Sequence, residues 1–364
     1  MENRLSVGIS HGDVNGISYE LIIKLLAENR MCELCVPILY GSPKVAAYYR
    51  KALNAETFAL NPIKEPSEAN GKRSNIINCA DDEVKVELGK ETDESDRAAM
   101  AALKRALDHA DGGHIDVVVA APQGKGSFLA DGAADLTDFL RKRYGAADAM
   151  TLAVNEKVRI GFVTEGGRLR DVPGQVTARG VLRKLTLLAN ALRDDFTIQK
   201  PKIAVLALNS RVRGEQSEEA VVIGPAIERA RQSGIMALGP FAAEEFFAKR
   251  MYEKFDAVLA MYRDQGMVPF SAMNVPGNAV YVAGLPVVCA ASLDDPRYDS
   301  VGQNQADEQG LRNALYLAMD VRANRARNKE LKRNPLPHYD IASNGNESDL
   351  NVEQIEGVKE ELED

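Results

Sequence analysis

Short apolar runs alternate with longer amphipathic segments along most of the chain. Apolar runs bounded by polar residues predict buried strands, and apolar residues every three or four positions predict helices. The predicted strands are residues 5–10, 36–40, 75–78, 117–121, 151–154, 158–164, 202–207, 257–261, 279–282 and 287–290. The predicted helices are residues 19–27, 43–53, 95–110, 178–192, 218–232 and 308–327. This alternation favours an α/β fold with largely parallel sheets.

Three loops that follow predicted strands are candidates for a site, because ligands in open α/β sheets sit beyond the carboxyl ends of strands. A polar loop, residues 262–266, follows strand 257–261. His11 lies in the first strand-to-helix loop, where a site residue is plausible and a structural role is the alternative. Residues 122–127 resemble a phosphate loop but lack the earlier glycine of that motif.

The charge of the chain is concentrated at one end. The net charge is −8 over 364 residues, but from Glu347 onward eight acidic residues face only Lys359. The tail therefore carries −7 and the rest about −1, which gives no bias towards nucleic acid or membranes. Residues 340–364 are polar and acidic, and we expect them to be disordered.

The apolar runs, the cysteines and the absence of two common motifs limit the classes of protein to which the chain can belong. No apolar run approaches the roughly 18 residues of a membrane span, and the N-terminus has no signal-peptide core. Cys32 and Cys35 form a C-x-x-C, but no second pair completes a zinc site. We expect a cytoplasmic protein with reduced thiols. The sequence contains neither a Rossmann G-x-G-x-x-G after a strand nor a G-x-S-x-G.

Five stretches in order along the chain resemble the 4-hydroxythreonine-4-phosphate dehydrogenase family of pyridoxal phosphate biosynthesis. They are residues 12–16, 163–173, 234–240, 260–266 and 284–286, and the similarity extends over about 4–340. The resemblance implies two α/β lobes around a central cleft, similar to isocitrate and isopropylmalate dehydrogenases. The lobes would be residues 1–125 with 287–335, and residues 126–286 with a homodimer interface. The family uses NAD without a Rossmann fingerprint, and NAD is expected on that ground.

The family holds a divalent metal with three histidines, and none of them is present at the matching positions. Gly166, Arg211 and Arg263 stand there instead. Glycine has no ligand atom, and a guanidinium stays protonated and has no lone pair to give. No divalent metal is therefore expected. In the family these ligands come from two subunits, so Arg211 and Arg263 would lie near each other in a dimer.

Other positions of the family's site differ as well. Leu136 replaces a substrate-contacting histidine, whereas the neighbouring Thr137 is retained. The phosphate-binding lysine, a substrate asparagine and a substrate arginine correspond to Ser271, Val280 and Cys289. The segment near the nucleotide becomes residues 294–299, whose candidate cofactor-binding residues are Asp294, Asp295, Arg297 and Asp299.

These losses predict a catalytically inactive or repurposed relative of the family, and they leave alternatives open. The two arginines would pair with Asp264, Asp294 or Asp295, or they would bind a small anionic ligand. A regulatory subunit in a mixed dimer with an active relative is a further alternative. The last is an active NAD-dependent dehydrogenase on another substrate, with Arg263 stabilising charge and Lys125 or Asp264 as the base.

Overall fold

A computed structural model of the chain describes residues 4–28, 30–55, 57–79, 84–209, 211, 214–273 and 275–333. Backbone contacts divide the chain into two units, Met1–Asn328 and Lys329–Asp364, and the account below concerns the first. The acidic tail lies outside the described residues. Among the described residues, no helix is long and apolar enough to cross a membrane.

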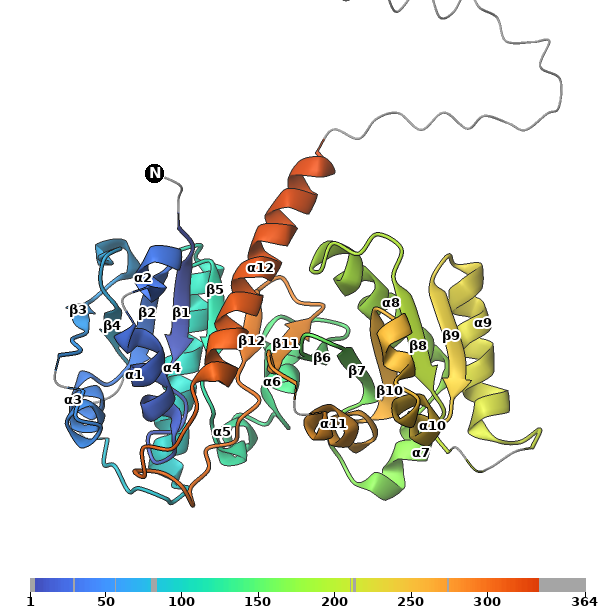
Figure 1. Cartoon of the computed structure of the whole chain (residues 1–364), viewed down its shortest axis with the longest axis horizontal. Helices are drawn as coiled ribbons and strands as arrows, with labels where there is room; N and C mark the ends of the chain where they lie inside the picture. Colours follow the sequence, from blue (N-terminus) through green and yellow to red (C-terminus); the bar gives the residue numbers. More distant parts are fainter. Residues whose placement is uncertain are drawn as a thin grey trace, which may run out of the picture. The chain divides into compact units, whose positions relative to one another are not determined.

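The first unit is built on one mixed sheet, as Figure 1 shows. The strands have the spatial order β3-β4-β2-β1-β5-β12-β11-β6-β7-β10-β8-β9. Eight neighbouring pairs are parallel, and the three antiparallel pairs all involve β11 or β6 in the middle of the sheet. The prediction of an α/β fold with largely parallel strands is confirmed. The division into two lobes stays a prediction, and the sheet runs through both without interruption.

The predicted strands are present with small shifts at their ends. They are β1 (Ser6–Ser10), β2 (Val36–Gly41), β4 (Asn75–Asn78), β5 (Val117–Ala120), β6 (Met150–Val154), β7 (Arg159–Thr164), β8 (Lys202–Leu206), β10 (Ala257–Tyr262), β11 (Ala279–Ala283) and β12 (Cys289–Ala291). Two further strands were not predicted, namely β3 (Asn61–Ile63) and β9 (Met236–Phe241). Both lie at the two ends of the sheet, where a strand buries fewer side chains and its apolar pattern is weak.

The predicted helices are also present. They are α1 (Ser18–Ala27), α3 (Pro43–Ala52), α4 (Asp93–Asp111), α8 (Ala178–Asp194), α9 (Gly224–Gln232) and α12 (Gln309–Leu331). Ser42 caps α3, since its side chain accepts the Val45 amide. Ser18 is the first residue of α1, and its hydroxyl donates to the Pro122 carbonyl. Shorter helices are α2 (Met31–Leu34), α5 (Lys125–Ala130), α6 (Leu136–Arg143), α7 (Val172–Gln175) and α10 (Ala243–Ala248).

The polar loop expected at residues 262–266 is a helix. Tyr262 ends β10, and α11 (Arg263–Ala272) begins at the next residue. The Gln265 side chain accepts the Met261 amide at 2.8 Å and donates to the Ala207 carbonyl at 2.6 Å. These two bonds fix the strand-to-helix junction, because they satisfy backbone groups that a loop would leave to water.

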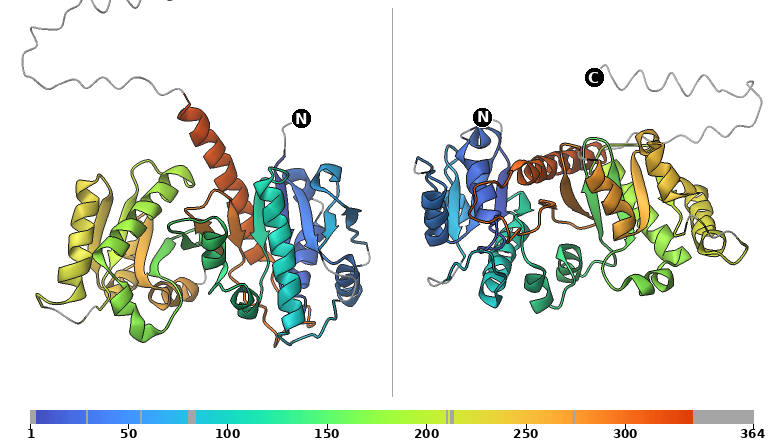
Figure 2. Two further views of the ribbon diagram at one scale, coloured as in Figure 1. Left: turned by 180° about the vertical axis from the view of Figure 1, so that it is seen from behind. Right: turned by 60° about the horizontal axis from the view of Figure 1, so that its bottom comes forward.

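The two faces of the sheet are covered differently, as Figure 2 illustrates. One face carries a single hydrophobic core that runs along the sheet from β4 to β9 and includes residues of α1, α3, α8, α9 and α12. The other face carries two separate cores. One contains residues of α4, α5 and α6, and the other contains residues of α10 and α11. The two cores meet over the middle strands, since Val282 of β11 belongs to the first and Ala153 of β6 to the second.

A buried polar network joins α12 to β11 and to the end of α8. The Arg325 Nε donates to Asp195 Oδ1 at 2.6 Å, and its Nη2 donates to the Tyr281 hydroxyl at 2.7 Å. That hydroxyl in turn donates to Asp195 Oδ2 at 2.7 Å. Asp195 is 3% exposed and Tyr281 is fully buried. All members are partnered, which is the condition for a buried ion pair to be tolerated.

Replacing Arg325 by Leu is expected to destabilise the fold strongly. The change leaves the buried Asp195 carboxylate without its cation, which costs about 3–5 kcal/mol of unfolding free energy. Arg322→Leu is the matched control, because Arg322 lies on the same helix and pairs with Asp116 at 39% side-chain exposure. Such an exposed pair is worth at most about 1 kcal/mol. Urea denaturation of both variants measures the difference, and equal losses would contradict the assigned role.

Gly266 is expected to be needed for the close packing of α11 on β7. A Cβ at this position would lie 2.7 Å from Ile160 Cγ2 and 2.8 Å from Phe162 Cε1, both on the buried β7. Gly266→Ala should therefore lower the unfolding free energy by about 1–3 kcal/mol. Gly174→Ala is the control, because a Cβ there meets nothing within 4 Å, and that variant should stay within about 0.5 kcal/mol of the parent chain. A stabilised Gly266→Ala would refute the steric argument.

Candidate functional site

A cavity of about 180 Å³ lies on the face of the sheet that carries two cores. Thr151 of β6 and Val280 of β11 contribute to it from the sheet. Phe128, which belongs to the core of α4, α5 and α6, lines it too, and so does Leu293, which packs against the other core. The cavity therefore lies where the two cores of this face meet, over β6 and β11.

Polar side chains that follow the ends of four strands converge on this cavity. Gln123 follows β5, Glu165 follows β7, Arg263 follows β10, and Ser292 with Asp294 and Asp295 follows β12. This arrangement is consistent with the expectation that site residues lie in loops after the carboxyl ends of strands. Asp135 and Thr137, at the beginning of α6, complete the polar lining.

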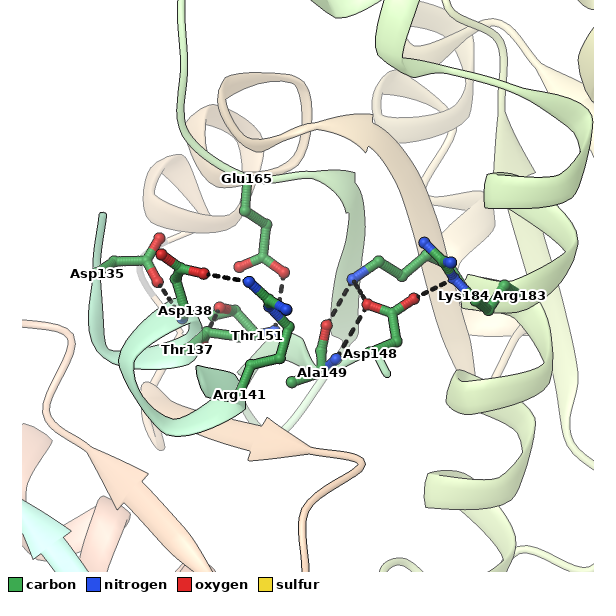
Figure 3. A network of polar contacts seen from close by, with 10 residues as sticks. All are labelled: Asp135, Thr137, Asp138, Arg141, Asp148, Ala149, Thr151, Glu165, Arg183 and Lys184. Atoms are coloured by element: carbon green, nitrogen blue, oxygen red, sulfur yellow. Dashed lines mark hydrogen bonds and ion pairs between the residues drawn. The ribbon is translucent and has the colours of Figure 1, made fainter. Parts of the chain in front are cut away.

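Hydrogen bonds hold the polar floor of the cavity in place, as Figure 3 shows. The Thr137 and Thr151 hydroxyls are 2.6 Å apart, and the Thr151 amide donates to Glu165 Oε1 at 3.0 Å. Asp135 caps α6 by accepting the Asp138 amide at 2.9 Å. Burial raises the pKa of Glu165, and the nearby Asp135 raises it further, while the Thr151 hydrogen bonds and Lys184 oppose the shift.

Arg263 contributes the cavity's guanidinium from the first position of α11. In the described part of the chain it has neither a hydrogen bond nor an ion pair, so it is not paired with Asp264, Asp294 or Asp295. A cation at a helix N-terminus also meets the positive end of the helix dipole. The Arg263 guanidinium is therefore free to receive an anionic group.

Arg211 and Asp264 lie elsewhere in this chain. They line a second cavity of about 870 Å³ together with Leu169, Phe247 and Val268. The Arg211 guanidinium pairs with Glu244 at 3.5 Å on an exposed surface. The expectation that Arg211 meets Arg263 concerns two subunits, and it stays a prediction.

Gly166 forms a tight turn directly after Glu165. Its φ is +77°, and the next residue, Gly167, has a φ of +86°. Residues other than glycine rarely adopt backbone conformations with such positive φ angles. A Cβ at Gly166 would meet only the Ala134 Cβ at 3.9 Å, so the position faces open space.

Several other positions named from the sequence lie at or near the cavity. Leu136, Thr137 and Val280 line it, whereas Cys289 is fully buried in β12 and Ser271 is exposed on α11. Beyond the two lining aspartates, the segment 294–299 packs on the loop after β1. The Pro296 carbonyl accepts the Ile17 amide at 2.9 Å, and the Tyr298 hydroxyl donates to Asp13. Arg297, with a φ of +48°, and Asp299 are exposed on this segment.

His11 is a core residue. It is fully buried and stacks on Tyr19 with ring centroids 5.4 Å apart. Burial lowers its pKa to about 4, so the ring is neutral at physiological pH. The Cys32 and Cys35 thiols are buried, and burial raises the pKa of Cys35 to about 12, which makes it unreactive.

The loop that resembles a phosphate loop is occupied by the chain's own carboxylates. The Gly126 amide donates to Glu91 Oε1 at 3.1 Å. Asp96 lies beside the same turn, because a Cβ on Gly126 would come within 2.2 Å of its Oδ2. The Asp96 Oδ1 is buried and has no hydrogen-bond partner in the described part of the chain. Burial raises the pKa of Asp96 to about 6, with the carboxylates of Glu91, Asp13 and Asp93 adding to the shift.

Two carboxylates of the cavity, Asp135 and Glu165, were not predicted as site residues from the sequence, and neither were the hydroxyl residues Thr151 and Ser292. Glu165 could have been identified as a candidate from the sequence, because it directly follows a predicted buried strand. Asp135 reaches the cavity because it caps α6, a helix that was not predicted.

Asp96 is expected to make stability depend on pH. Between about pH 4 and pH 6 the folded chain keeps a proton that the unfolded chain has lost, so the unfolding free energy falls as the pH rises through this window. Asp96→Asn removes the ionisation and should stabilise the chain above pH 6 by on the order of 1 kcal/mol. Urea denaturation at pH 5 and pH 7.5 measures this. Glu33→Gln, which removes an exposed carboxylate on α2, is the control, and a gain at pH 5 equal to that at pH 7.5 would exclude the mechanism.

Comparison with known proteins identifies the family of the chain. The family model described as "Pyridoxal phosphate biosynthetic protein PdxA" matches residues 33–318. The chain is 39% identical over 343 residues to a 4-hydroxythreonine-4-phosphate dehydrogenase of Bacteroides thetaiotaomicron, covering 92% of this chain and 93% of that protein. It is 30% identical over 324 residues to the enzyme of that name from Aquifex aeolicus, covering 86% and 98%.

Solved structures have the same fold. Crystal structures of 4-hydroxythreonine-4-phosphate dehydrogenases from Burkholderia phymatum and Klebsiella pneumoniae match with TM-scores of 0.70 and 0.71. Their sequences are 24% and 23% identical to this one, and the matches cover 88% and 87% of this chain and 99% of each structure. At that identity the likeness supports the fold alone. With the family model and the 39% identical relative, however, the assignment is clear: the chain belongs to the PdxA family.

Proposed function

We propose that this PdxA-family protein no longer performs metal-dependent dehydrogenation and keeps the site for binding. The observation that carries the proposal is the set of side chains at the three positions where the resemblance expects metal-binding histidines. Gly166 has no side chain and turns with a φ of +77°. Arg211 and Arg263 are guanidinium groups, which do not bind a metal as ligands.

The surroundings of these positions supply no substitute ligand set. Among the described residues of the chain, no group of three or more His, Cys, Asp and Glu side chains is arranged to hold a metal ion. The residues present therefore do not fit a divalent metal. Without such a Lewis acid, a hydride transfer needs another group to stabilise the developing charge on oxygen.

An active dehydrogenase with a different mechanism is less well supported. Arg263 and its proposed base Asp264 line different cavities of the chain, so they do not face one reacting centre within it. Lys125, the other proposed base, is exposed and does not line the cavity of Arg263. A base must lie within hydrogen-bond reach of the proton that it removes.

NAD is expected from the resemblance alone. The segment proposed to contact the nucleotide carries Asp294, Asp295 and Asp299 against the single guanidinium of Arg297. This excess of carboxylates disfavours the pyrophosphate of a dinucleotide. A homodimer, and a mixed dimer with an active relative, also follow from the resemblance, and light scattering and co-purification measure them.

A turnover assay tests the proposal. The purified chain, with NAD, Mg²⁺ or Mn²⁺ and 4-phosphohydroxythreonine, is expected to form no NADH above background. The Bacteroides thetaiotaomicron relative is assayed in parallel as the positive control. A thermal unfolding scan gives a second readout, since a metal that binds the folded state raises Tm and none is expected to do so here. NADH formation dependent on the chain would overturn the proposal.

A further inference from the structure

The cavity of about 180 Å³ is strongly acidic. Four carboxylates line it, those of Asp135, Glu165, Asp294 and Asp295, against the one guanidinium of Arg263. None of these five side chains forms an ion pair with any described residue of the chain. If all of them are ionised, the lining carries three negative charges in excess.

Neighbouring carboxylates that do not line the cavity are paired. Asp148 binds both Arg183 and Lys184, at 2.7 Å and 2.9 Å, and Asp138 binds Arg141 at 2.8 Å, as Figure 3 shows. These two carboxylates thus have the cationic partners that the four in the cavity lack. Unpaired charges of one sign on a concave surface attract a mobile charge of the opposite sign.

The acceptor oxygens of the lining that remain without a hydrogen bond favour a ligand group with several N–H donors. From the described residues, Asp135 accepts a hydrogen bond from the Asp138 amide, Glu165 from the Thr151 amide and Asp294 from the Ser292 hydroxyl, each through one oxygen. The buried Oε1 of Gln123, a residue that lines the same cavity, has no partner among the described residues. An ammonium group has three donors and no acceptor, which matches an excess of free acceptors.

Arg263 and the charge balance of the cavity define the rest of the ligand. The unpaired guanidinium is the cavity's single strong site for a carboxylate, which it receives through two parallel hydrogen bonds. A phosphate group brings about two negative charges and would add to the existing excess. Ser271, which stands where the resemblance expects a phosphate-binding lysine, is exposed on α11 and supplies no cation.

We propose that this cavity binds a small, unphosphorylated amino acid, with its ammonium group among the four carboxylates and its carboxylate on Arg263. This deepens the proposed function and rests on it, because it assigns a ligand class to the site that is kept for binding. The cavity thereby selects against the phosphorylated compounds named for the relatives.

Calorimetric titration of the purified full chain with matched compounds tests the proposal. 4-Hydroxy-L-threonine carries the ammonium, the carboxylate and two hydroxyls; its 4-phosphate adds only the phosphate. 2,3,4-Trihydroxybutanoate replaces the ammonium by a hydroxyl, and 3-amino-1,2-propanediol lacks the carboxylate. The amino acid is expected to bind at least tenfold more tightly than each of the other three. Equal or tighter binding of the phosphate ester or of the hydroxy acid, or no binding of the amino acid at 10 mM, would overturn the proposal.

Substitutions of lining residues test which side chains bind the ammonium group and which bind the carboxylate of the ligand. Asp295→Asn is expected to weaken amino-acid binding at least fivefold, and because Asp295 is exposed and unpaired, Tm should not fall. Arg263→Ala should weaken the amino acid and leave the aminodiol unchanged. Glu33→Gln, which removes an exposed carboxylate on α2, is the control and should change nothing. Unchanged binding in Asp295→Asn and Arg263→Ala would refute the site.

The binding result is distinguishable from a failure of the proposed function. NADH formation in the turnover assay would refute the loss of catalysis whatever the titrations give. A preference for the phosphate ester without NADH formation would refute the ligand class and leave the loss of catalysis standing.

Discussion

The antiparallel strand β11 is the constraint on which the rest of the structure depends. It pairs with β12 on one side and with β6 on the other, and these pairings join two sets of parallel strands into one sheet. Successive residues of a strand point to opposite faces. Tyr281 enters the network with Asp195 and Arg325 on one face, and Val280 lines the cavity on the other. The network that fixes α12 and the cavity that binds a ligand therefore share adjacent residues of one strand.

The boundary between two cores explains why the site lies where it does. Helices of the two parallel sets build separate cores on that face, one reaching Val282 of β11 and the other Ala153 of β6, and the cavity is lined from both. Residues after β5 and β12 reach the cavity from one set, and residues after β7 and β10 reach it from the other. Side chains from four strand ends are thus brought together without any one loop having to be long.

The sequence predicted the strands and helices that bury apolar side chains, because burial leaves a periodic pattern. It failed at Tyr262–Gly266, where Arg263, Asp264 and Gln265 read as a polar loop although they form the first turn of α11. The bonds from Gln265 to Met261 and Ala207 that stabilise this turn depend on strands distant in sequence, so no local pattern contains them. The same reason applies to the site. Arg263 was identified as a key position, but its separation from Asp264 depends on the direction in which a helix begins.

The charges around the cavity argue against an anion-binding site, although Arg263 considered alone would suggest one. Arg263 alone would favour an anionic ligand, and that is how the position reads in the sequence. In three dimensions Asp135, Glu165, Asp294 and Asp295 surround the same space, and the buried environment already raises the pKa of Glu165. Charges of one sign repel, so unpaired carboxylates around one cavity destabilise each other's ionised form. A ligand that brings a positive charge removes this repulsion, and a second anion increases it. The acidic lining is therefore better explained by a cationic group bound there than by a cavity left over from lost catalysis.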